Sequence, residues 1–307
     1  MLQSLYSAIS ALQAHQQLLG VVSNNLANIN TTGYKASRTL FQDTLSQTLK
    51  APTQGTATTA GTNGIQIGLG VSLSTVTPRF DQGALQSTGV PTDLAIEGQG
   101  FLTVNDPATG QSSYTRVGAL ALDSNNYLVD ANGYRVQGVQ VPPAQLFNGQ
   151  YGDVNPVYTP TDGQALGDLQ ITNTWAPNPD PAQPLRNSPA VSFSIEASGR
   201  VLMQLESGVT LPVGYIAENR FQDPQALLRS GKNDFVETPA AGRVFTGYKA
   251  PGNGGLGNLR AGYLEMSNVD MGQEFTDMIR AQRGLQANSR VITTSDEVLQ
   301  DLIQLKR

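Results

Sequence analysis

Leucine recurs every seven residues in the first part of the chain, with isoleucine beside it, at Leu5, Ile9, Leu12, Leu19 and Leu26. This apolar stripe predicts an amphipathic α-helix that ends where turn-forming residues gather, between Asn28 and Gly33. The other positions are mostly Gln, Ser, Asn and Ala, and no charged residue precedes Lys35. A helix bundled inside one monomer normally carries charges on its outer face, so this neutral face favours packing among many copies.

The C-terminal region carries a second apolar stripe, formed by Phe275, Met278, Leu285, Ile292 and Leu299. It predicts a second helix, which Ser267 or Asn268 can cap and in which Asp270 and Glu274 are favourable near the positive end of the helix dipole. Both terminal helices therefore need apolar partners. We expect them to pair as a coiled-coil-like inner layer while the middle of the chain projects outward.

The middle of the chain shows a different period. From Val71 onward short alternating runs are separated by turn residues, which predicts antiparallel strands and hairpins. One hairpin is expected at Asp130-Ala131-Asn132-Gly133, because Asn-Gly suits a two-residue turn. The uncharged stretch between Lys50 and Arg79 is rich in Thr, Gly and Ala, which is typical of an extended connector.

These patterns predict an α+β fold with a mainly antiparallel β middle region. The expected parts are a helical core of residues 1–35 and 268–307, a linker of 36–78, and a β-rich domain of 79–140 and 190–267. The proline-rich run 141–189 is expected to form an insertion with a small outer lobe.

The amino-acid composition argues against several classes of function. The 307 residues are 39% hydrophobic, which allows a core, and only 14% charged, with a net charge of −5. This acidic balance argues against a general nucleic-acid binder. The chain has no cysteine and one histidine, His15, so thiolate chemistry is excluded and a histidine-based site has a single candidate. No apolar run reaches the roughly 20 residues that span a bilayer, and no cleavable secretory signal is apparent.

Three candidate sites carry only weak signals. Gly252 to Gly257 matches G-x-G-x-x-G, but Pro251 precedes it and a strand-like run follows, so a flexible loop is favoured. Asp123, Asn125 and Asp130 lack the closing glutamate of a calcium loop and are better explained by a turn. His15 has no acid or base near it in the sequence. We therefore expect no catalytic, cofactor-binding or metal site, and a protein that is not an enzyme.

Several motifs resemble the bacterial flagellar axial proteins, which are the hook, distal-rod and proximal-rod subunits. The most specific is the N-terminal motif with Asn24, Asn25, Asn28, Asn30, Thr31, Gly33, Tyr34 and Lys35. The runs 93–101 and 114–118 resemble hallmarks of the family's β domain. The runs 265–270, 282–284 and 288–290 complete the resemblance, which covers nearly the whole chain except 141–189.

The resemblance implies a helical homopolymer in which the terminal helices surround a central channel and the β domains lie outside. It also implies export by the flagellar type III apparatus, a place in the hook or basal body, and contacts with rod, hook-cap, hook–filament junction and export proteins. Neither nucleic-acid binding nor membrane insertion is expected.

The runs 61–70 and 133–138 look more like short hook proteins, so we expect a hook subunit whose curved tube transmits torque as a universal joint. The alternative is a distal-rod subunit of a straight drive shaft. A third possibility, from another class, is an extracellular ligand-binding β domain with helical stalks.

Overall fold

A computed structural model describes residues 2–55, 60–141, 160–171, 190–206 and 210–305. The chain divides into two compact units. The first, called the helical unit below, comprises Met1–Ile29, Lys35–Arg79 and Val269–Arg307. The second, called the β unit, comprises Asn30–Tyr34 and Phe80–Asn268.

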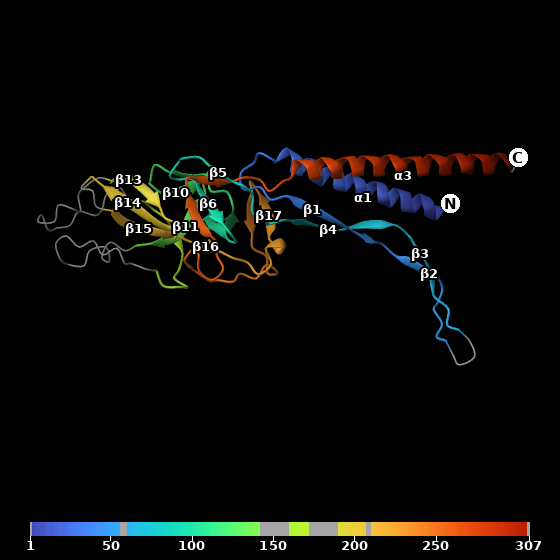
Figure 1. Cartoon of the computed structure of the whole chain (residues 1–307), viewed down its shortest axis with the longest axis horizontal. Helices are drawn as coiled ribbons and strands as arrows, with labels where there is room; N and C mark the ends of the chain where they lie inside the picture. Colours follow the sequence, from blue (N-terminus) through green and yellow to red (C-terminus); the bar gives the residue numbers. More distant parts are fainter. Residues whose placement is uncertain (1, 56–59, 142–159, 172–189, 207–209, 306–307) are drawn as a thin grey trace, which may run out of the picture. The chain divides into compact units, whose positions relative to one another are not determined.

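Two long helices, α1 (Leu2–Ala27) and α3 (Met271–Leu305), lie side by side in the helical unit (Figure 1). They run antiparallel, since the start of α1 and the end of α3 lie at the same end of the pair. As predicted, α1 ends just before the turn-forming residues, and the backbone N–H of Asn28 donates to the carbonyl of Asn24. No helix within the described residues is long and apolar enough to cross a bilayer.

The start of α3 is capped by Asp270. Its Oδ1 accepts hydrogen bonds from the backbone N–H groups of Gly272 at 2.8 Å and Gln273 at 3.2 Å. The prediction of Ser267 or Asn268 as the cap is therefore wrong, because the helix begins later than the sequence suggests.

A two-stranded antiparallel ribbon accounts for most of the stretch predicted as a connector. Its strands are β1 (Ser37–Asp43) with β4 (Val71–Pro78), and β2 (Ser46–Lys50) with β3 (Ile65–Gly68). The register joins Ser37 to Pro78 and Ser46 to Gly68, with a bulge between Leu40 and Phe41. Polar residues alternate with Leu and Ile here, and β-branched residues are frequent, so the stretch pairs with itself although it looks like a linker.

The β unit is built around one large antiparallel sheet. Along its main path the order is β13-β14-β15-β11-β7-β8-β18-β17, and β9, β10, β12 and β16 pair beside this path. The first strands are β7 (Phe101–Asn105), β8 (Ser112–Thr115), β9 (Leu120–Leu122), β10 (Leu128–Asp130), β11 (Arg135–Gln140) and β12 (Gly167–Asp168). The later ones are β13 (Ala190–Ile195), β14 (Arg200–Leu205), β15 (Thr210–Ile216), β16 (Glu218–Asn219), β17 (Leu228–Gly231) and β18 (Asp234–Val236).

Smaller pairs complete this unit. They are β6 (Leu94–Glu97) with β19 (Asn258–Ala261), and β5 (Leu85–Ser87) with β20 (Tyr263–Glu265). A 3-10 turn, η2, spans Pro224–Ala226. These pairings confirm the α+β class, with terminal helices and a mainly antiparallel middle.

The predicted hairpin at residues 130–133 is confirmed. Val129 of β10 pairs with Arg135 of β11, and Gly133 adopts a φ of +83°, which an L side chain rarely takes. Asp130 Oδ1 accepts from the backbone N–H groups of Asn132 and Tyr134, which closes the turn.

Alternation along β7 divides the core of the β unit into two clusters. Leu102 and Val104 enter an aliphatic cluster, whereas Phe101 joins an aromatic one. In the aromatic cluster Tyr114 meets Phe221 edge to face, with ring centroids 4.7 Å apart. Of the insertion predicted at 141–189, residues 142–159 and 172–189 lie outside the described residues, and the part between them contains β12.

Candidate functional site

The packing around α1 depends on small side chains. Contact with α3, β1 and β4 buries Ala8, Ala14, Val22 and Asn25 of α1. On α3, Ala281 is fully buried. Small residues allow the helix backbones to approach closely.

His15 of α1 packs directly against Gly284 of α3. A Cβ atom placed on Gly284 would lie only 2.6–2.9 Å from three atoms of the imidazole ring. The absent side chain of Gly284 therefore makes the space that the ring occupies. His15 Nδ1 is buried and has no hydrogen-bond partner in the described part of the chain, so the ring acts here as a packed group.

Asn25 links three elements of the helical unit. Its Nδ2 donates to the carbonyl of Ser37 at 2.9 Å and to Glu274 Oε1 at 3.0 Å, and its Oδ1 accepts from the Ser37 N–H at 2.9 Å. The end of α1 is thereby joined to the start of β1 and to the first turn of α3. Burial raises the pKa of Glu274, and the hydrogen bond from Asn25 opposes this shift.

The apolar stripes predicted from the sequence are only partly covered in the monomer. Intermediate exposure is found at Leu5, Leu12, Leu19, Leu26, Met278, Leu285, Ile292 and Leu299. Ile9 and Phe275 are 44% and 45% exposed. Further large apolar side chains are exposed nearby, at Tyr6, Met271, Ile279, Val291, Val298 and Ile303. Exposed apolar residues in such number are typical of interaction surfaces.

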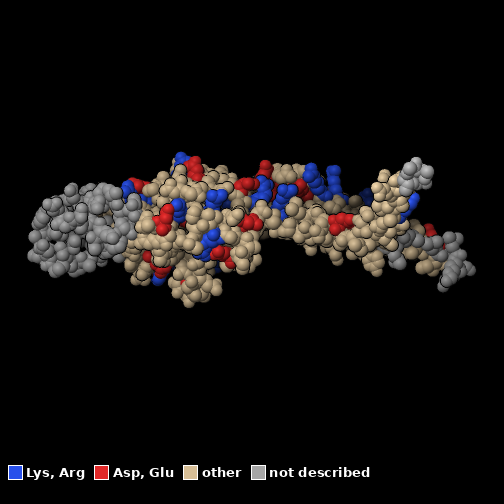
Figure 2. Space-filling view, turned by 90° about the horizontal axis from the view of Figure 1, so that it is seen from below, with Lys and Arg blue, Asp and Glu red and all other residues tan. Residues whose placement is uncertain are grey.

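Few charges interrupt the molecular surface in Figure 2, where uncharged residues cover most of the face in view. α1 contains no charged side chain, and the charges of the helix pair come from α3. An uncharged surface avoids like-charge repulsion between identical copies.

The remaining residues of the N-terminal motif fix the turn after α1. The Nδ2 of Asn28 donates to Asn24 at its carbonyl and its Oδ1, Asn30 is exposed, and the Thr31 carbonyl accepts from the Tyr34 N–H. Tyr34 and Lys35 are both buried. The turn is therefore held by polar contacts and by burial at its end.

Gly33 has a strict requirement for glycine. Its φ is +67°, and a Cβ atom there would lie 2.7 Å from Val117 Cγ2. Its N–H donates to the carbonyl of Glu265 at 2.8 Å. The chain entering the β unit is thus bonded to the chain leaving it.

Glu265, whose carbonyl binds the Gly33 N–H, also forms a buried ion pair with Arg116. Arg116 Nη1 lies 3.3 Å from Glu265 Oε2, and both side chains are at most 3% exposed. Arg116 Nη2 donates to the Gly98 carbonyl at 2.9 Å, and Glu265 Oε1 accepts from the Gly83 N–H at 2.9 Å. Burial lowers the pKa of Arg116, and the negative charge of Glu265 opposes this shift. We call the contacts of Arg116 and Glu265 the junction.

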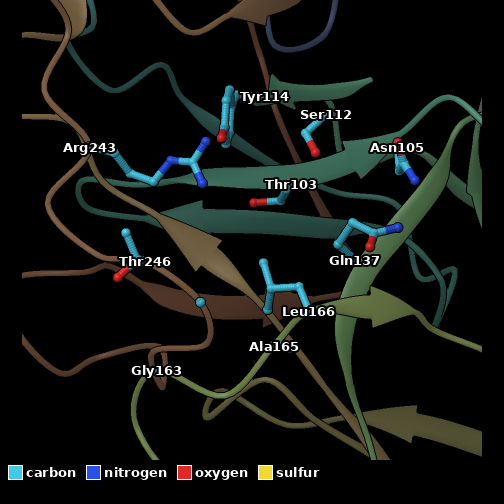
Figure 3. Close-up of a pocket in the computed structure, with 11 residues that line it drawn as sticks. Thr103, Asn105, Ser112, Tyr114, Gln137, Gly163, Ala165, Leu166, Arg243 and Thr246 are labelled. Atoms are coloured by element: carbon cyan, nitrogen blue, oxygen red, sulfur yellow. The ribbon is translucent and has the colours of Figure 1, made fainter. Parts of the chain in front are cut away.

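A polar cavity of about 520 Å³ opens on another part of the β unit (Figure 3). Cross-strand pairs Thr103–Tyr114 and Asn105–Ser112 contribute to its lining, with Gln137 from β11. Tyr114 and Arg243 both donate hydrogen bonds to Glu237, and burial raises the pKa of Tyr114 to about 12. Within the described residues this lining offers hydroxyl and amide groups and the guanidinium of Arg243, but no histidine, cysteine or carboxylate.

Sequence reasoning did not find the junction or the small-residue contact. Arg116 and Glu265 both lie in motifs noted above, yet nothing in one sequence pairs residues so far apart. Ala8, His15 and Val22 do recur every seven residues, so a signal for the α1 contact was present beside the leucine column.

Comparison with known proteins gives consistent matches along the chain. Residues 5–35 match the family model of flagella basal body rod proteins. Residues 95–203 match that of the flagellar hook protein FlgE/F/G D1 domain. Residues 260–305 match that of the flagellar basal body rod FlgEFG protein C-terminal region.

Three relatives, two named as rod proteins and one as a hook protein, are similar to the chain over its whole length. The flagellar basal-body rod protein FlgG of Bacillus subtilis is 40% identical over 307 residues, which is 100% of both chains. The protein of the same name from Borreliella burgdorferi is 35% identical over 309 residues, again 100% of both. The flagellar hook protein FlgE of Borreliella burgdorferi is 28% identical over 446 residues and 100% of both chains.

Proposed function

The chain belongs to the family of flagellar hook and basal-body rod proteins, and from this premise we propose that it is a distal-rod subunit. The family consists of structural proteins that polymerise within the flagellar axis. In this proposal, copies of the chain form a straight tube that serves as a drive shaft and encloses an export channel. The hook function favoured by the sequence becomes the alternative.

One observation carries the choice of rod over hook. Within one organism, Borreliella burgdorferi, the rod relative aligns over 309 residues and the hook relative over 446. The hook alignment is therefore 446 − 307 = 139 positions longer than this chain, at lower identity. The full-length, length-matched similarity to rod proteins supports a rod subunit.

The ribbon formed by the β1–β4 and β2–β3 pairs agrees with a straight shaft. A bending joint needs elements that slide against their neighbours as the tube rotates. Backbone pairing along β1–β4 and β2–β3 removes conformational freedom from this stretch. A paired ribbon therefore suits a stiff tube better than an unpaired connector would.

The helical unit supplies the surface for polymerisation in this proposal. The two partly covered stripes, with Leu12 and Leu285 near their centres, become fully buried against neighbouring copies. Exposed apolar residues on α1 and α3 and the neutral face of α1 support this role. The further partners are the adjoining rod and hook proteins and the type III export apparatus.

Deletion of the gene in its own host tests the proposal. Basal bodies purified from the deletion strain are imaged by electron microscopy, with a strain complemented from a plasmid as the control. We expect a shortened rod and no hook, because the straight segment on which the hook is built is missing. Complete straight rods that lack only the curved tube would overturn the proposal in favour of a hook subunit.

A further inference from the structure

Glu218 of β16 is a fully buried carboxyl group beside the junction. Its exposure is 0%, and neither Oε1 nor Oε2 accepts a hydrogen bond from the residues that the structure describes. Gly100, directly before β7, approaches so closely that a Cβ atom there would lie 2.9 Å from Glu218 Oε2. A carboxylate with no donor in such a place is strongly disfavoured, whereas a neutral carboxylic acid is tolerated.

The charges around Glu218 do not compensate a second carboxylate. The charged group that acts on it is Arg116, in the segment directly after β8. This guanidinium is already paired with Glu265 of β20, and the chain before β7 presents Gly100, which carries no charge. Arg116 Nε is also buried without a hydrogen-bond partner in the described part of the chain, so this group does not bond to Glu218. With both glutamates ionised, two buried negative charges would share one positive charge.

We infer that Glu218 carries a proton in the folded β unit and that loss of this proton at alkaline pH loosens the junction. An ionised Glu218 competes with Glu265 for Arg116, whose contact with Glu265 is 3.3 Å long. The backbone carbonyl of Glu265 accepts a hydrogen bond from the N–H of Gly33, and its Oε1 accepts one from the N–H of Gly83. The proton on Glu218 therefore stabilises the contacts between the segments that enter and leave the β unit.

The direction of the pKa shift agrees with this geometry. Burial raises the pKa of Glu218 from 4.5 to about 8, and Arg116 opposes the shift. The folded state thus binds a proton that the unfolded state lacks between these two values. The inference rests on the β unit alone and does not depend on the choice between rod and hook.

Proton uptake on folding tests the first half of the inference. The full-length chain is refolded from urea at pH 6.5 in weak buffer with a pH indicator. Wild type should take up about one proton more per chain than Glu218→Gln, whose amide is neutral in both states. Glu196→Gln, at a partly exposed glutamate paired with Arg200, is the matched control and should equal wild type. Equal uptake by wild type and Glu218→Gln would overturn the inference, as would a Glu218→Gln chain that fails to fold at pH 6.5.

Amide hydrogen exchange tests the second half. Rates for Gly33 and Gly83 are measured at pH 6.5 and pH 9 and corrected for the intrinsic effect of pH on exchange. Protection in wild type should fall about tenfold at pH 9, one unit above the midpoint, while Glu218→Gln keeps its protection. Unchanged protection in wild type would show that ionisation does not release the junction.

Discussion

The substitution Gly284→Ala probes how closely α1 and α3 approach. The added methyl group would lie 2.6–2.9 Å from His15 Nε2, Cε1 and Cδ2, so the ring or the helices must move. Overpacking of this kind costs about 1–3 kcal/mol. Alanine is a better helix former than glycine by about 1 kcal/mol, which offsets part of this cost. The net expectation is a loss of about 0–2 kcal/mol of unfolding free energy.

The chain provides a matched control in the partner helix. A Cβ atom added to Gly20 of α1 would have no atom within 4 Å, so Gly20→Ala should stabilise the helices by about 1 kcal/mol. Urea midpoints of the circular-dichroism signal at 222 nm are compared for both variants and wild type. The two variants should differ by about 1–3 kcal/mol, which is the cost of the clash alone.

A second substitution refines this test. His15→Ala in the Gly284→Ala background removes the ring that the new methyl group meets, so most of the clash should disappear from the double-mutant cycle. If Gly284→Ala stabilised the helices as much as Gly20→Ala, the close packing of His15 on Gly284 would be refuted. Strictly additive effects of the two substitutions in the double mutant would refute this packing as well.

Three further predictions concern single polar or backbone positions. Asn25→Ala removes the bonds to Ser37 and Glu274 and should lower the unfolding free energy by about 1–3 kcal/mol in urea titration. Gly33→Ala should lower the thermal unfolding temperature more than Gly110→Ala does, because a Cβ atom at Gly110 meets open space whereas one at Gly33 meets Val117. Burial, aided by the charge of Asp130, raises the pKa of Asp234 from 3.8 to about 6, so its stabilising contribution is lost as pH rises from about 4 to about 6. Asp234→Asn should flatten the stability profile in that pH range, and an unchanged slope would contradict the shift.

Period and turn chemistry are enough to predict the long elements. The seven-residue stripes locate both helices, and Asn132-Gly133 locates a hairpin, because these signals are local. Of the ribbon, β4 lies in the run from Val71 onward for which strands are expected, whereas β1, β2 and β3 are missed because Thr, Ser and Gly are compatible with a strand and with a connector. Only the pairing of residues that lie between 15 positions (Lys50 with Ile65) and 41 positions (Ser37 with Pro78) apart decides between them.

The polar centres cannot be predicted for a different reason. Arg116 and Glu265 are separated by 149 positions, and Glu218 lies in neither of their motifs. The electrostatic interactions of these three residues arise from their burial and from the one positive charge that the two glutamates share, and both depend on the folded sheet. Likewise, Asp270 becomes the helix cap because tertiary contacts hold Asn268, whose Nδ2 donates to the Asp81 carbonyl.

Assembly in vitro tests the central claim most directly. Purified chain is concentrated until it polymerises and is imaged by negative-stain electron microscopy, beside a variant that lacks residues 1–34. The account predicts straight tubes from the complete chain and none from the variant, because the α1 stripe is part of the polymer contact. Curved tubes would contradict the rod function, and a persistent monodisperse particle, or tubes that form without residues 1–34, would contradict assembly through the terminal helices.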